Sequence, residues 1–322
     1  MSALPPARVL EVEPAEYHKL PGFSASLAKI LIGSCAAKAR DAWERRAEKL
    51  ADEDEGVSDD KRKRLETGAV LDALVLGKGK VIEVVPTDVL AKNGSYGTKE
   101  SKALRDAARA AGRIPVKEPE MPIYERSSDA IKARLAAAGH KLDGISQLAI
   151  EWHEASPHGP VQCRAMLDHV VGGRVWNQDE PRSADDRVVA RALGHATHAT
   201  IFDLKIVGDA HPDRCERTAE NLGYAIQAAA YKRALAALYP RLAGRMEFRF
   251  LFCEPGRPYL FWDPPESGVF RELGERRWLR AVRAWGEGLA TGRWPDYRTP
   301  DRVEITVPMW TLKQEGFQPE EF

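Results

Sequence analysis

The residues with the clearest capacity for chemistry are Asp203 and Lys205, which stand two positions apart in the apolar run 201–207. A run this apolar predicts a buried strand, and residues two apart in a strand point to the same face. Two charges are tolerated inside a protein when they pair or hold a metal ion. A carboxylate that holds a divalent ion, beside a lysine that orients or activates water, suits metal-assisted cleavage of a phosphodiester.

A second acid, Asp168, lies among apolar residues in the strand-like segment 161–171. Another short segment, 151–154, precedes it, and the residues 156–160 between them contain Pro157, Gly159 and Pro160. Such a cluster is a strong turn signal. The two segments therefore predict a β-hairpin that carries Asp168.

A helix is expected downstream, in the alanine-rich segment 221–231. Tyr224, Gln227 and Tyr231 lie three and four positions apart there, so they share one face of that helix. Core packing is the simplest account of such a stripe. Gln227 argues against it, because a buried amide needs hydrogen-bond partners.

An acidic strand, an Asp-x-Lys strand and a helix with Gln and Tyr, in this order, resemble the PD-(D/E)xK nuclease superfamily. More narrowly, the chain resembles the RecE (exonuclease VIII)-like exonucleases of phages and prophages, relatives of lambda-type exonuclease. Three more segments fit in sequence order. They are 22–31, similar to the family's S-x-S-x-x-K helix; 67–77, similar to its G-x-x-x-H-x-L-x-L helix; and 294–297 with 308–310, similar to its closing W-P-x-Y … P-x-W segment.

The resemblance implies a mixed α/β fold, with a restriction-endonuclease-like core in which helices flank a central mixed sheet. It also implies Mg²⁺ or Mn²⁺ as cofactor, since hard cations prefer oxygen ligands. The expected ligands are the carboxylates of Asp168 and Asp203, with Asp72 as a third and the backbone carbonyl of Leu204 as a fourth.

The remaining residues of the expected site act on water, phosphate or DNA. Lys205 would position the water or neutralise charge in the transition state. Gln227 and Tyr231 would support the site or contact the DNA strand, whereas Tyr224 is the weaker member of the stripe.

The chain departs from the family at several positions. Asp72 stands where the family usually has His, although lambda-type relatives place a carboxylate on the equivalent helix. Met166 stands where the family often has Arg, with Arg164 close by, and Ile206 stands where Thr is common. The polar segment 176–187 predicts an inserted loop. These differences keep a second hypothesis open, a catalytically weakened relative that binds DNA or regulates.

The function implied by the resemblance is that of a metal-dependent exonuclease which resects linear double-stranded DNA for phage-type recombination. The single-stranded tail would pass to a strand-annealing protein, and a ring-shaped homo-oligomer would favour processive digestion. An endonuclease on the same core is a third hypothesis.

Basic residues that could contact DNA lie mainly in the segment 99–113. Lys102, Arg105, Arg109 and Arg113 recur there at helical spacing, and such a face could neutralise phosphates. An ordinary solvated helix face is the alternative. Arg164, near the acidic strand, is a further candidate for DNA contact.

Composition narrows the class of protein. Lys and Arg total 48, as do Asp and Glu, so general affinity for nucleic acid is not expected from net charge. No apolar stretch predicts a membrane span, and the N-terminus lacks the pattern of a signal peptide, so we expect a cytoplasmic protein. Four scattered cysteines do not suit an iron–sulfur cluster, and His195 with His198 lacks further zinc ligands.

The expected organisation is an N-terminal helical segment, residues 1–60, packed on a nuclease domain that spans 61–322 as one compact unit. Ser24 is expected to cap a helix in the region 24–50, and the charged run 59–64 is expected to be an exposed loop. The other expected elements are a short helix at 68–76, a strand at 81–85, a helix at 127–138, a hairpin of 245–252 with 259–262, and a closing helix at 272–289.

Overall fold

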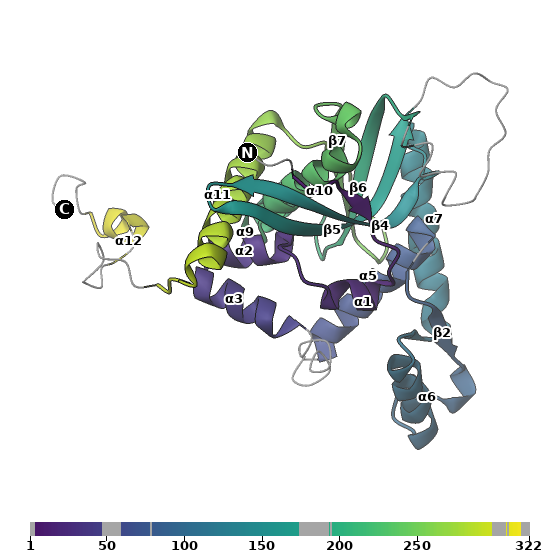
Figure 1. The fold of residues 1–322 in the computed structure, drawn as a ribbon. Coiled ribbons are helices and arrows are strands. Elements are labelled where there is room, and N and C mark those ends of the chain that lie inside the picture. The colour runs from purple at the N-terminus through teal and green to yellow at the C-terminus, as the bar shows by residue number, and fades with distance from the viewer. Residues whose placement is uncertain are drawn as a thin grey trace.

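A computed structural model describes residues 4–46, 59–77, 79–173, 193, 195–297, 307 and 309–316. Its centre is a mixed sheet of six strands in the order β1-β4-β5-β6-β7-β8 (Figure 1). Strands β6 and β7 are parallel, and the other neighbours are antiparallel. The bounds are β1 Arg8–Val9, β4 Ile145–Ser156, β5 Gly159–Gly173, β6 His198–Ile206, β7 Met246–Cys253 and β8 Phe261–Trp262.

Helices cover both faces of this sheet, because strands such as β6 carry apolar side chains on both faces. Ile201 enters one apolar core, whereas Phe202 and Leu204 enter another on the opposite face. The first core packs against α2 (Ala25–Gly33), α3 (Ala36–Glu44), α10 (Tyr224–Leu238) and α11 (Gly268–Thr291), and the second against α5 (Asp59–Leu76) and α7 (Met121–Ala137). The predicted mixed α/β fold with a helix-flanked sheet is confirmed.

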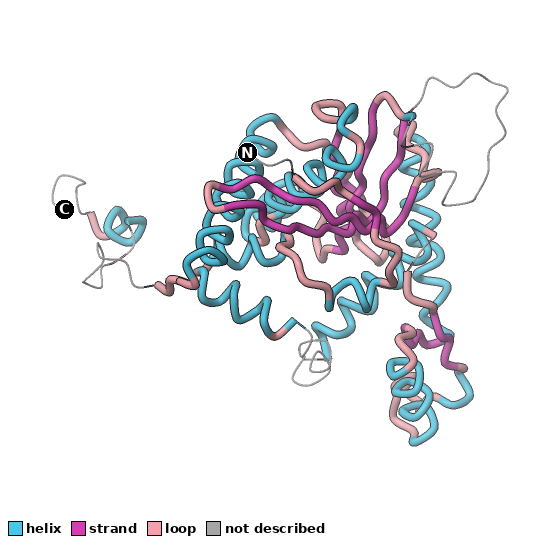
Figure 2. The backbone as a smooth tube through the Cα atoms, viewed as in Figure 1, coloured by secondary structure: helices cyan, strands magenta, loops and turns pink. Residues whose placement is uncertain are grey.

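The remaining elements lie at the periphery. β2 (Ile82–Val85) and β3 (Ile114–Lys117) form a two-stranded parallel sheet, which makes a small lobe with α6 (Lys99–Ala110), seen below the main sheet in Figures 1 and 2. α1 (Pro14–Lys19), α9 (Pro212–Asn221) and α12 (Met309–Gln314) complete the described helices, with short 3-10 turns at Thr87–Val89, Glu118–Glu120 and Pro240–Leu242. No helix among the described residues has the length and apolar character needed to cross a membrane.

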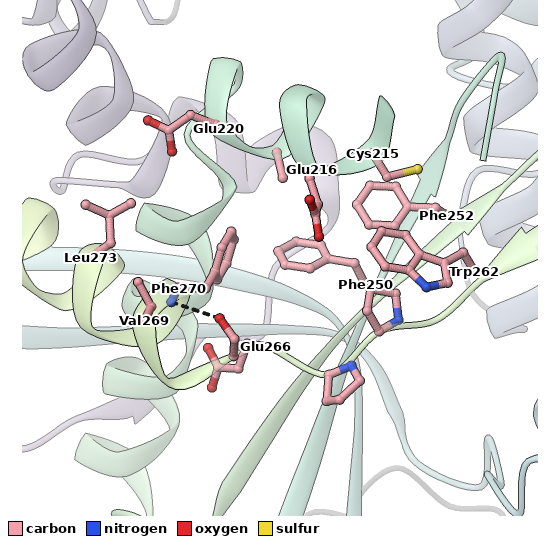
Figure 3. Close-up of a pocket in the computed structure, with 14 residues that line it drawn as sticks. Cys215, Glu216, Glu220, Phe250, Phe252, Trp262, Glu266, Val269, Phe270 and Leu273 are labelled. Carbon is pink, nitrogen blue, oxygen red and sulfur yellow. Dashed lines mark hydrogen bonds between the residues drawn. The ribbon is translucent and has the colours of Figure 1, made fainter. Parts of the chain in front are cut away.

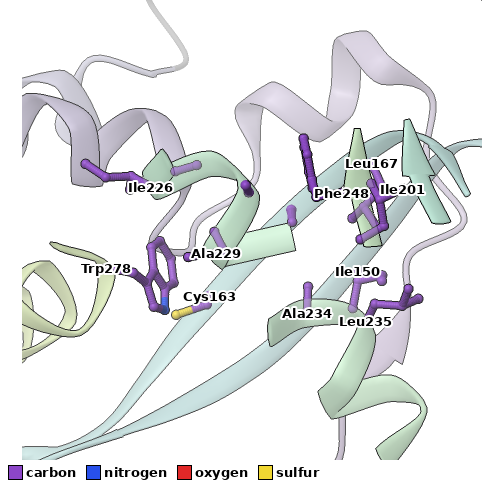
Figure 4. Packing of buried hydrophobic residues seen from close by; sticks show 14 of the residues in the cluster. Ile150, Cys163, Leu167, Ile201, Ile226, Ala229, Ala234, Leu235, Phe248 and Trp278 are labelled. Carbon is purple, nitrogen blue, oxygen red and sulfur yellow. The ribbon is translucent and has the colours of Figure 1, made fainter. Parts of the chain in front are cut away.

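The larger core is aromatic and closely packed. Phe248, Ile201 and Leu167 from the sheet belong to this core together with Leu235 of α10 and Trp278 of α11 (Figure 4). Aromatic rings extend the packing, with Phe23 stacked on Trp285 at 5.0 Å and Trp152 on Trp278 at 6.0 Å between ring centroids. This burial holds α10 against the sheet, and α10 carries the Tyr/Gln stripe.

A buried carboxylate, that of Glu154, ties the sheet to two helices. Its Oε1 accepts hydrogen bonds from Nε1 of Trp152 at 2.8 Å and Nε1 of Trp278 at 3.2 Å. Arg233 of α10 donates to the same carboxylate from Nε at 2.7 Å. Because β4, α10 and α11 all supply partners, the negative charge of Glu154 is compensated and these three elements are held together.

Some predicted elements are confirmed and others differ from the structure. Ser24 caps α2 by accepting a hydrogen bond from the Leu27 amide, and the hairpin of β4 and β5 forms as predicted. The charged run 59–64 is not a loop: it forms the first turns of α5, as Lys and Arg are good helix formers. The predicted strand at 81–85 lies in the small lobe, outside the main sheet. The predicted loop at 176–187 lies outside the described residues.

The contact between α10 and α11 depends on Gly274. A Cβ atom at this position would lie 2.1 Å from the backbone oxygen of Ala225, so the two helix backbones approach too closely for a side chain. Gly268, in the first turn of the same helix, would meet nothing within 4 Å.

We therefore expect Gly274→Ala to lower the free energy of unfolding by about 1–3 kcal/mol, because the helices must separate. Gly268→Ala, the matched control, should leave it unchanged or raise it by up to about 1 kcal/mol. Urea denaturation of both variants measures this. Equal stability of the two variants would contradict the close contact.

Candidate active site

The site forms where β5 and β6 separate. Their ladder runs from the pair Gly173–His198 to the pair His169–Phe202. Asp168 and Asp203 are the next residues beyond this last pair, one on each strand. Further along, β5 meets Phe23 instead, whose backbone bonds to Gln162 and Arg164. Figure 1 shows that the β4–β5 hairpin diverges from β6 and β7 beyond this point. The two acids therefore stand at a fork in the sheet.

A backbone irregularity accompanies Asp168. The β4–β5 register joins Leu148 with Leu167 and Ser146 with His169, but it skips the intervening pair of Gln147 with Asp168. Gln147 has a φ of 54°, in the left-handed region that residues other than glycine rarely adopt. Strain of this kind concentrates at functional sites.

Asp203 and Lys205 point to the same side of β6, as predicted from their spacing. The carboxylate of Asp203 is fully buried, and its Oδ2 lies 2.5 Å from Nζ of Lys205. Burial lowers the pKa of Lys205, but the negative charges of Asp203 and Asp168 outweigh burial and raise this pKa above its ordinary value. Lys205 is therefore an ammonium at neutral pH.

The carboxyl groups of Asp168 and Asp203 are in contact. Burial raises the pKa of Asp168 well above its usual range, and the adjacent charge of Asp203, with a hydrogen bond between the two side chains, raises it further. Two carboxyl groups this close either share a proton or hold a cation.

Asp72, on α5, stands near this pair without joining it. Burial raises the pKa of Asp72 to about 7; the charge of Lys205 lowers it and that of Asp203 raises it. Within the described part of the chain, no three side chains of the His, Cys, Asp and Glu types gather into a group that could hold a metal ion. Leu204 turns its side chain into the opposite core, and the role of its carbonyl stays a prediction.

Gln227 and Tyr231, which the sequence places on one face of α10, lie next to Asp203. Gln227 donates from Nε2 to Oδ1 of Asp203 at 2.8 Å and to the hydroxyl of Tyr231 at 3.2 Å. Tyr224 packs differently: its ring stacks on Phe250 at 5.5 Å, and Nζ of Lys205 lies 5.0 Å from its centroid. Gln227 thus has the partners that a buried amide requires.

One residue of the site was missed from the sequence. Lys29 of α2 donates from Nζ to Oε1 of Gln227 at 2.8 Å. Burial lowers its pKa to about 8, the positive charge of Lys205 adds to this, and the charges of Asp203 and Asp168 oppose it. The signal was present, because Lys29 is the lysine of the S-x-S-x-x-K pattern in 22–31 and the single charged residue in the apolar helix 25–33.

The donor set suits a hard divalent cation. Oδ2 of Asp203 is buried and, apart from its ion pair with Lys205, accepts no hydrogen bond in the described structure. A carboxylate oxygen whose partner is a single ammonium has lone pairs with which it can also ligate a metal ion, and Asp168 adds a second oxygen donor beside it. Mg²⁺ and Mn²⁺ prefer such ligands.

A cavity of about 480 Å³, with both polar and apolar walls, adjoins Asp168. Asp168 and Tyr231 line it together with Arg164, Arg46 and His18. Arg164 was predicted to contact DNA. It stacks over the ring of Tyr17 at 4.5 Å, and its Nη1 donates to the backbone oxygen of that residue at 2.7 Å, so it also anchors α1.

The basic residues of α6, and Arg113 just after that helix, belong to the small lobe and take acidic partners. Arg105 pairs with Asp106 at 2.8 Å, Arg109 with Glu66 at 2.8 Å, and Arg113 with Glu83 at 2.6 Å. These ion pairs compensate much of the positive charge expected of this face. Lys102 is exposed on the same helix.

A second pocket, of about 340 Å³, lies elsewhere. It is apolar, formed by Phe250, Phe252, Trp262 and Phe270 beneath α9 and α11 (Figure 3). None of the predicted site residues lines it, so it is not the candidate active site. His195 and His198 are exposed, and all four cysteines are free and buried.

Comparisons with known proteins reveal a distant structural likeness. No family model and no curated protein matches the chain. Among solved structures, the crystal structure of a putative exonuclease from Eubacterium rectale is similar with a TM-score of 0.47 and 11% identity, over 95% of this chain and 97% of that one. A likeness this weak carries no argument about activity, and the site must be judged on its own side chains.

If Asp203 is a metal ligand, Mg²⁺ should stabilise the folded protein. A ligand at a hundred times its dissociation constant adds about 2.7 kcal/mol, which raises Tm by several degrees. We expect this rise in the parent and its loss in Asp203→Asn, as followed by thermal denaturation with and without Mg²⁺. Asp106→Asn, a control on exposed α6, should respond like the parent. An undiminished rise in Asp203→Asn would contradict the assignment.

Proposed function

We propose that this protein is a metal-dependent deoxyribonuclease that acts as an exonuclease on linear double-stranded DNA. The observation that carries the proposal is the meeting of Asp168, Asp203 and Lys205 at the fork between β5 and β6. Two carboxylates in contact, one of them fully buried, together with an adjacent ammonium, suit phosphodiester hydrolysis better than a structural role, because an apolar core would cost less.

The cofactor would be Mg²⁺ or Mn²⁺, held by Asp168 and Asp203, with Asp72 and the carbonyl of Leu204 as further ligands. When bound, such an ion lowers the pKa of water and stabilises charge on phosphate oxygens. The chain's own residues then have distinct tasks. Lys205, kept protonated by two neighbouring carboxylates, neutralises charge that develops on the phosphate. Gln227 orients Asp203, and the hydroxyl of Tyr231 faces the strand to be cut.

The cavity beside Asp168 supports DNA as the substrate. Arg164 and Arg46 line it, and cationic side chains next to a cleavage site favour a phosphate backbone. A ring-shaped homo-oligomer around linear duplex would favour processive digestion, and the resulting single strand would be the substrate of an annealing protein. Lys102, Arg105 and Arg109 of α6 would add outlying contacts to DNA.

A second candidate is a catalytically weakened relative that binds DNA or regulates. It is favoured by one observation: in the described residues the three predicted carboxylates do not form a single metal-binding group. Asp72 stays apart from the contacting pair, so the ligand set is complete only if Asp72 or backbone oxygen joins it.

The distinguishing assay is incubation of the purified protein with Mg²⁺ and either linear or covalently closed circular duplex DNA. We expect release of nucleotides from the linear form only. Lys205→Met should lower this rate by at least about 100-fold, because a transition-state cation is lost. Lys132→Met, an exposed lysine of α7, should cleave like the parent.

Each other outcome selects a different account. Cutting of closed circles would indicate an endonuclease on the same core. No cleavage with Mg²⁺ or Mn²⁺ would favour the weakened relative. Full activity of Lys205→Met would contradict the site itself.

A further inference from the structure

Lys29 enters the site from a helix that is otherwise apolar. Its stem is confined on two sides. Gly223 has a φ of 62°, and a Cβ there would lie 3.2 Å from Cγ of Lys29, so a side chain at this position would crowd the stem and strain the backbone. The ring of Tyr224 lies below the ammonium, 5.1 Å from Nζ to the centroid. The lysine is therefore held in one orientation, toward Gln227.

The partner of this ammonium is unusual. Lys29 is half-buried, yet it forms no ion pair with any carboxylate in the described parts of the chain. It donates a hydrogen bond to a neutral amide oxygen, Oε1 of Gln227. A partly desolvated charge that takes a neutral partner costs stability, so a function is the better explanation of its presence.

The hydrogen bond determines which way the amide of Gln227 faces. An ammonium only donates, so Oε1 must turn toward Lys29, and the two N–H groups of Nε2 must turn away. Those N–H groups meet Oδ1 of Asp203 at 2.8 Å and the hydroxyl of Tyr231 at 3.2 Å. The reversed amide would set its oxygen against the carboxylate, which is repulsive.

We propose that Lys29 is a positioning residue that acts through Gln227: it aims the amide so that an N–H group, and not the amide oxygen, faces Oδ1 of Asp203 and orients that carboxylate as a ligand for a divalent cation. The inference rests on the proposed function, because it assigns Lys29 to the metal site of that nuclease. Groups that orient a metal ligand in this manner commonly contribute 10–100-fold to metal affinity.

The alternative is that Lys29 contacts a DNA phosphate directly. The two roles differ in the absence of DNA, where only a positioning residue affects binding of the ion. They differ also in their dependence on Gln227, since a positioning residue has no effect once the side chain through which it acts is gone.

The first experiment measures Mn²⁺ binding to the full-length protein without DNA, by electron paramagnetic resonance of the free ion. Lys29→Met keeps the stem and removes the donor, and we expect it to weaken binding by roughly 10-fold or more. Lys29→Arg retains a donor and should recover most of that loss. Lys132→Met should bind like the parent, and circular dichroism checks that every variant is folded.

The second experiment combines Lys29→Met with Gln227→Met. If Lys29 acts through the amide, the double variant binds Mn²⁺ as weakly as Gln227→Met alone, because the two effects are not additive. Full additivity of the two losses would overturn the proposal.

Mn²⁺ binding distinguishes failure of the role given to Lys29 from failure of the proposed function. Binding by Lys29→Met that equals the parent's overturns the role of Lys29 and leaves the proposed nuclease standing. A parent protein that binds no Mn²⁺ overturns both.

Discussion

The carboxylate of Asp203 is the constraint on which the site depends. It is fully buried in a strand whose neighbours are apolar, and an uncompensated charge there would cost several kcal/mol. The structure compensates it with Lys205 on the same strand, whose Nζ lies 2.5 Å from Oδ2, and with Gln227 on α10, which donates to Oδ1. An apolar residue here would cost the fold less, and this cost supports the proposed role of the charge in chemistry.

The rest of the fold brings these partners together. Gly274 allows α11 to lie against α10, and Glu154 ties both helices to β4. This packing sets the position of Gln227 over the fork in the sheet. The fork in turn needs β5 to leave β6 at Asp168, where Gln147 adopts its left-handed conformation. The register of β5 on β6 thus places Asp168 beside Asp203, and the helix packing places Gln227 next to them.

Alternation along strands predicted much of this site. Asp203 and Lys205 share a face because they are two residues apart, and helical spacing correctly joined Gln227 with Tyr231. The contact of Asp168 with Asp203 could not be derived in that way, because it depends on strand pairing and on an unusual φ at a residue that is not glycine. Lys29 and the first turns of α5 were missed for different reasons: the lysine acts across 198 residues of sequence, and the charged run 59–64 has no apolar stripe.

The central claim is that the carboxylates of Asp168 and Asp203 together bind one divalent cation. The most direct test is a crystal structure of the protein with Mn²⁺, in which anomalous scattering locates the ion. The account predicts one peak within about 2.3 Å of an oxygen from each carboxylate, the range of hard-cation ligands. An ordered site without a peak, with Lys205 still paired to Asp203, would contradict it.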